Sequence, residues 1–140
     1  MKSLVPVDGS PFTKRMLAYL AAHDEWLGGL HQYTLLHVAP AVPPRAAAVL
    51  DKAVLQAHYT EESDKVFKPL RTFFAKQKIP VEFAAKVGPV ADSIASLAEK
   101  GRFGLVMMGS HGHGALGSLV MGSVVTRVLA RCKTPVLIVR

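Results

Sequence analysis

The 140-residue chain is predicted to form a single α/β domain, residues 1–140, with helices on both faces of a doubly wound, mostly parallel five-stranded sheet. Two observations predict this fold class. Short apolar runs alternate with stretches whose apolar residues recur at helical spacing, an order typical of right-handed βαβ crossovers. Two of these runs, Leu105–Met108 and Val136–Val139, have no polar interruption, as expected for strands buried from both sides. The expected strands are Lys2–Asp8, Tyr33–Val38, Val81–Val87, Phe103–Met108 and Pro135–Val139.

The first expected strand leads directly into a helix. The residues Asp-Gly-Ser-Pro that begin at Asp8 have turn chemistry, with Ser10 placed to cap the helix and Pro11 at its first position. Gly28 and Gly29 are expected to end this helix.

The region after the second strand is expected to begin irregularly. Three prolines in Ala39–Arg45 cannot continue a ladder and predict a loop. From about Ala48 to Lys78 the pattern is helical, and Pro69 inside it is expected to kink or divide the helix. Further helices are expected over Ala91–Lys100 and before the last strand, ending near Arg131.

Composition excludes several classes of protein. No apolar run approaches the roughly 20 residues that a membrane span needs, and the first residues lack the apolar stretch of a secretory signal, so we expect a cytoplasmic protein. Cys132 is the only cysteine, which excludes an intrachain disulfide. The net charge of +7 is spread over several helices without a basic run, so a nucleic-acid partner is not expected, although the charge favours small anionic ligands.

Glycine is concentrated in one segment, Gly109 to Ser123, which follows a strand and leads into a helix. Five of the eleven glycines lie between Gly109 and Gly122. Glycine lets successive backbone N–H groups approach phosphate oxygens, and the start of a helix adds unpaired donors. Asp8 and Val38 also lie at the carboxyl ends of expected strands, where doubly wound sheets bind ligands. The plainer interpretation is an ordinary loop in which Ser123 caps the next helix.

Two common phosphate-binding patterns do not account for this segment. The P-loop pattern GxxxxGK[ST] needs a lysine that is absent here. The pattern GxGxxG is matched from Gly112 to Gly117. A dinucleotide site, however, also needs an acidic residue about 20 positions further on, and the next expected strand ends in Ile138, Val139 and Arg140 instead.

A third pattern, Gly-x2-Gly-x9-Gly-[Ser/Thr], is met in full by Gly109, Gly112, Gly122 and Ser123. It resembles the nucleotide signature of the universal stress protein family. The opening LVPVDGS, the strand LLHV, the turn and helix VGPVADSI and the closing TPVLIVR are also laid out as in that family. The resemblance extends over essentially the whole chain.

This resemblance implies a sheet of flavodoxin-like strand order, adenine nucleotide alpha hydrolase-like in type, that holds ATP, or AMP or ADP, across the strand ends. Asp8 would face the adenosine, Val38 would meet the adenine through its backbone, and Gly109 would lie near the ribose. Gly112, Gly122 and Ser123 would hold the phosphates, with Mg²⁺ arriving on ATP. The residues implied to line the nucleotide are Pro6, Val7, Asp8, Val38, Met108, Gly109, Ser110, His111, Gly112, Gly122, Ser123 and Val124.

Plainer roles stay open for two of these residues. Asp8 could make an Asx turn with the residues that follow it, and the side chain of Val38 could belong to the core. The loop also departs from many relatives, which carry Arg or Lys near the phosphates where this chain has His113, Gly117 and Ser118. A basic residue from elsewhere in the chain would have to compensate.

No catalytic residue and no protein-held metal are expected. The chain has no GxSxG elbow, and His37 at a strand end is expected to be packed or hydrogen-bonded rather than a general base. Asp8 could orient a water near a phosphate, which leaves slow ATP hydrolysis open. The leading hypothesis is a nucleotide-binding regulatory protein of the stress response, and the rival is a dimeric interaction module that binds no nucleotide. The family resemblance also implies a homodimer through Pro135–Val139, unless a helix of the same chain covers that edge.

Overall fold

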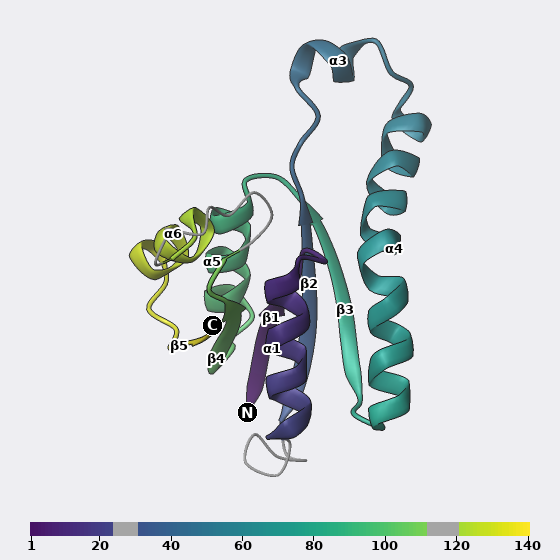
Figure 1. Ribbon diagram of the computed structural model, residues 1–140. Helices are drawn as coiled ribbons and strands as arrows, with labels where there is room; N and C mark the ends of the chain where they lie inside the picture. Colours follow the sequence, from purple (N-terminus) through teal and green to yellow (C-terminus); the bar gives the residue numbers. More distant parts are fainter. Residues whose placement is uncertain (24–30, 112–120) are drawn as a thin grey trace.

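The computed structural model describes residues 1–23, 31–111 and 121–140. The sheet contains β1 (Lys2–Pro6), β2 (Gln32–Ala39), β3 (Val81–Val87), β4 (Leu105–Gly109) and β5 (Val136–Val139) (Figure 1). Their order is β3-β2-β1-β4-β5, and all four neighbouring pairs are parallel. The predicted fold class, a doubly wound parallel α/β sheet of five strands, is confirmed.

The expected flavodoxin-like strand order is wrong. That order would be 2-1-3-4-5, with the third strand beyond the first. Here β3 pairs instead with β2 along its whole length, from Tyr33 opposite Val81 to Ala39 opposite Val87. The first two crossovers therefore step in the same direction, and the chain then crosses to the other side of β1 to form β4.

Two helices cover each face of the sheet (Figure 1). The first face carries α1 (Pro11–Ala22) and α4 (Lys52–Gln77), and the second carries α5 (Val90–Lys100) and α6 (Ser123–Arg131). Because side chains alternate along a strand, β1 sends Val5 into the first core and Leu4 into the second. Both side chains are completely buried, so β1 is the centre around which the two layers are built.

Several predicted boundaries need correction. The helix α1 ends at Ala22, earlier than the expected stop at Gly28 and Gly29, which lie outside the described residues. The predicted irregular loop, Ala39–Arg45, overlaps at its end with the short helix α3 (Pro44–Ala48), which has Pro44 in its first turn.

The long helix α4 begins at Lys52, later than predicted, because Asp51 caps it by accepting a hydrogen bond from the backbone N–H of Ala53 at 3.3 Å. Pro69 does not divide this helix, which continues to Gln77. Phe67 before the proline and Leu70 after it are both buried against the sheet, so tertiary packing holds the two halves together.

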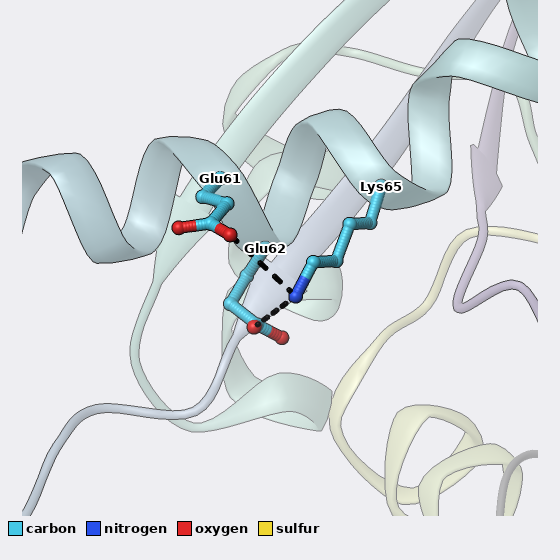
Figure 2. A network of polar contacts seen from close by, with 3 residues as sticks. All are labelled: Glu61, Glu62 and Lys65. Carbon is cyan, nitrogen blue, oxygen red and sulfur yellow. Dashed lines mark ion pairs between the residues drawn. The ribbon is translucent and has the colours of Figure 1, made fainter.

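The outer face of α4 is polar. Figure 2 shows Lys65 between two carboxylates, with its Nζ 3.8 Å from Glu61 Oε1 and 3.6 Å from Glu62 Oε1. Exposed pairs of this spacing contribute only about 0.3–0.5 kcal/mol each. In the described part of the chain, no helix is long and apolar enough to cross a membrane.

The two strands expected to be buried from both sides differ. In β4, Val106, Met107 and Met108 are buried, as predicted. In β5 only the last residue, Val139, is buried, because β5 lies at the edge of the sheet. An uninterrupted apolar run therefore does not by itself distinguish a central strand from an edge strand.

Candidate functional site

The candidate site lies where the chain reverses direction across the sheet, between the carboxyl ends of β1 and β4. After β1 the chain crosses over to β2 on one side of it, whereas β4 pairs with β1 on the other side. In open α/β sheets this switch point is the usual place for a ligand. Most of the residues predicted from the sequence lie here, on the segment from Pro6 to Asp8 and on the segment from Met108 to His111.

Asp8 is held in a turn at the start of α1. Its Oδ1 accepts hydrogen bonds from the backbone N–H of Ser10 at 2.9 Å and from the hydroxyl of Thr13 at 2.8 Å. The backbone N–H of Asp8 in turn donates to Thr13 Oγ1 at 3.2 Å. The Asx-turn alternative is therefore confirmed, and the carboxylate lies at the positive end of the α1 dipole.

The predicted cap of α1 is also confirmed. Ser10 Oγ accepts from the backbone N–H of Thr13 at 3.4 Å, and Pro11 is the first helical residue. The sequence interpretation missed Thr13, which is buried and joins Asp8 and Ser10 into one network. The Ser-x-x-Thr spacing across the helix start was the signal that pointed to it.

Gly109 at the end of β4 lies directly against α1. A Cβ atom on Gly109 would come within 2.9 Å of Phe12 Cβ and 3.0 Å of the Phe12 carbonyl oxygen. The absence of a side chain therefore allows β4 and α1 to approach each other, a packing role that the motif did not reveal.

Ser110 connects the end of β4 to β5 and to the start of α6. Its backbone N–H donates to the carbonyl of Val139 at 2.9 Å, and its carbonyl accepts from the backbone N–H of Gly122 at 2.8 Å. Its buried hydroxyl lies 2.9 Å from His111 Nδ1. The bond from Gly122 brings the start of α6 back to the carboxyl end of β4, so two parts of the predicted motif meet here.

The start of α6 corrects one prediction. Ser123 does not cap the helix, because it is already the first helical residue, and Gly122 holds the cap position with φ −72° and ψ 159°. No side chain among the described residues makes a capping hydrogen bond here. The first-turn N–H groups lack acceptors within the helix, so this end of α6 can donate to an anion.

The side chains of the other predicted residues mostly have structural roles. Val7, Val38 and Met108 are buried in the two cores, which confirms the core alternative for the Val38 side chain. Pro6 and Val124 are half-buried. Gly112 lies outside the described residues.

His37 at the end of β2 is packed and hydrogen-bonded, as predicted. Its Nδ1 lies 2.9 Å from Ser63 Oγ on α4, and its ring meets the edge of Phe67 at a centroid distance of 6.1 Å. Burial lowers the pKa of His37 below its ordinary value of 6.5, while the negative charges of Glu62 and Asp8 partly oppose this shift. The fold therefore favours a neutral imidazole beside the switch point.

An aromatic and basic group missed by the sequence interpretation lies on α1. The ring of Phe12 lies 4.8 Å from the ring of His111, measured between centroids, and the guanidinium carbon of Arg15 lies 5.2 Å from the Phe12 ring centroid. Phe12 and Arg15 are three positions apart and therefore share one face of the helix.

A shallow hollow of about 540 Å³ elsewhere on the surface lies along α4, from Gln56 to Lys68. Another, of about 320 Å³, lies beside Asp92 and Arg131, which form an ion pair between α5 and α6. Neither hollow is lined by a residue predicted for the nucleotide. In the three described ranges, no group of three or more His, Cys, Asp or Glu side chains could hold a metal ion.

Comparisons with known proteins identify the family and the fold. A family model described as the universal stress protein family matches residues 1–140. A universal stress protein of Thermus aquaticus is 30% identical over 138 residues, covering 98% of this chain and 96% of the relative. The solved structure of the hypothetical protein MJ0577 is 26% identical with a TM-score of 0.80, covering 99% of this chain and 94% of that one.

Two solved structures with lower identity share the fold and contain nucleotides. The universal stress protein from Archaeoglobus fulgidus, in complex with dAMP, has a TM-score of 0.70 at 19% identity, covering 100% of this chain and 98% of that one. A family member from Arabidopsis thaliana, with AMP bound, has a TM-score of 0.70 at 14% identity, covering 99% and 90%. From the full-length family match and the Thermus relative, we conclude that this chain belongs to the universal stress protein family.

Proposed function

We propose that this protein binds ATP or a related adenine nucleotide at the carboxyl ends of β1 and β4 and acts as a regulatory protein of the stress response. The observation that carries the proposal is the hydrogen bond of 2.8 Å from the Gly122 N–H to the Ser110 carbonyl. It brings the uncapped start of α6 to the end of β4, at the switch point of the sheet. The dAMP and AMP complexes of family members with the same fold support an adenine nucleotide as the ligand.

The roles of individual residues follow from their places in the fold. The adenosine would lie beside Asp8 and the backbone of Val38, with the ribose near Gly109. The phosphates would be held by Gly112, by Gly122 and by Ser123, whose exposed hydroxyl is not used as a helix cap. The remaining lining residues are proposed to be Pro6, Val7, Met108, Ser110, His111 and Val124.

The donor set at the switch point suits a phosphate group. Backbone N–H groups at the start of α6 supply hydrogen-bond donors, and the helix dipole favours negative charge at that end. Mg²⁺, when present, would be held mainly by the phosphates and water. Binding would change the surface that a partner protein contacts.

A thermal-shift experiment tests the proposal. With Mg-ATP at 100 times its dissociation constant, the folded state gains about 2.7 kcal/mol, which should raise the melting temperature by several degrees. Inorganic phosphate at the same concentration serves as the control, and it should have a much smaller effect. No rise with Mg-ATP, together with no nucleotide retained after purification, would instead support the dimeric module that binds no nucleotide.

We also propose a homodimer through Pro135–Val139. This segment contains β5, whose apolar residues Leu137 and Ile138 are half-buried at one edge of the sheet. Edge strands with unpaired backbone groups tend to pair with another chain. Light scattering at low micromolar concentration should give twice the 15.1 kDa mass of the chain. A monomer mass would contradict this assembly.

A further inference from the structure

The glycine-rich segment of the proposed nucleotide site has no lysine or arginine of its own. Gly109 to Ser123 contains no Lys, Arg, Asp or Glu. Backbone N–H groups can hold a monophosphate, but a diphosphate or triphosphate adds negative charge that needs a cation nearby. A basic side chain that acts beside any Mg²⁺ arriving with the nucleotide would therefore come from another element of the fold.

The helix α1 supplies basic residues at the end of the sheet where the nucleotide is proposed to bind. Its sequence from Pro11 to Ala22 contains Lys14 and Arg15 and no acidic residue. The helix starts next to the carboxyl end of β1, and the close approach of Phe12 to Gly109 places its first turn against the carboxyl end of β4. Its positive end thus lies beside the switch point.

Arg15 is connected to this site through an aromatic ring. Its guanidinium carbon lies 5.2 Å from the centroid of Phe12, and Phe12 in turn lies 4.8 Å from the ring of His111. A guanidinium stacked on a ring keeps its N–H groups in one plane, free to bind phosphate oxygens in pairs. His111 follows the last residues of β4 and is fixed by the Ser110 hydroxyl at 2.9 Å.

We propose that Arg15, held on the Phe12 ring, contacts the phosphates beyond the first one and selects ATP and ADP over AMP. The proposal rests on the nucleotide site proposed above and assigns the basic group that the loop lacks. The contacts that join Arg15 through Phe12 to His111 favour Arg15 over Lys14, which is also exposed on α1.

The test compares dissociation constants for ATP and AMP by calorimetry in the wild type, Arg15→Gln, Arg15→Lys and Lys14→Gln. Arg15→Gln keeps a polar side chain but shortens it and removes its charge, so ATP should bind about tenfold more weakly while AMP changes by less than about twofold. Arg15→Lys should recover part of the loss, and Lys14→Gln should change neither constant by more than about twofold. Thermal melting of each variant without ligand confirms that it is folded.

The measurements distinguish a failure of the proposed nucleotide binding from a failure of the role of Arg15. A wild type that binds neither nucleotide removes the proposed function and this inference with it. A wild type that binds both, with Arg15→Gln weakening them equally or no more than Lys14→Gln does, overturns the role of Arg15 alone. A selective loss of ATP affinity in Lys14→Gln but not in Arg15→Gln would assign the role to Lys14 instead.

Discussion

Replacing Gly122 with valine should abolish ATP binding and leave the protein folded. Gly122 lies at the cap of α6, where the proposed phosphates approach the backbone, and a branched side chain would occupy their space. We expect the ATP dissociation constant to rise at least about a hundredfold, equivalent to about 2.7 kcal/mol of binding free energy. Isothermal titration calorimetry measures this change directly.

The fold should tolerate this substitution because of the backbone conformation of Gly122. Its φ of −72° and ψ of 159° lie in the extended region that valine adopts readily, and its N–H can still donate to the Ser110 carbonyl. Ala130→Val, which places the same side chain two turns further along α6 on an exposed position, is the matched control and should retain ATP binding. Normal ATP affinity in the Gly122 variant would contradict the phosphate site.

The second large effect is expected at Gly109, and it concerns stability. Gly109→Ala would place a Cβ atom 2.9 Å from Phe12 Cβ, 3.0 Å from the Phe12 carbonyl oxygen and 3.1 Å from its carbonyl carbon. Two of these three atoms belong to the backbone of α1, so the helix itself must move. We expect a loss of about 1–3 kcal/mol in the free energy of unfolding, measured by urea denaturation.

Gly104→Ala is the matched control for this prediction. A Cβ atom on Gly104 would also meet close neighbours, at 2.7 and 2.8 Å, but these are the Cγ and Sδ atoms of Met1. The flexible side chain of Met1 can move away, so the free energy of unfolding should change by no more than about 0.5 kcal/mol. Equal losses in the two variants would mean that the contact between β4 and α1 is not the cause.

Much of the fold could be predicted from local pattern. Apolar runs located all five strands, and Asp8, Ser10 and Pro11 indicated the turn and cap that lead into α1. These features depend on residues a few positions apart, so their physical causes are visible in the sequence. The division of α4 that Pro69 suggested does not occur, because contacts of the helix with the sheet outweigh a local defect.

The candidate site could be predicted only in part. The spacing of Gly109, Gly122 and Ser123 identified the segment, yet it did not show that Gly109 lies against Phe12 or that Gly122 caps α6 in place of Ser123. The basic residue missing from the loop could not be assigned at all. Arg15 is 94 positions before Gly109, and only the packing of α1 on β4 brings the two elements together.

The sequence by itself determined the fold class, the family resemblance and the segment where an anion would bind, because each follows from short-range periodicity and spacing. The tertiary structure decided the strand order, the edge position of β5 and the placement of α1 beside the carboxyl end of β4. Strand order depends on which distant segments pair, and every such pairing here joins parallel strands through long crossovers. No local pattern specifies those partners, so the switch point at β1 and β4 emerges only when the sheet is assembled.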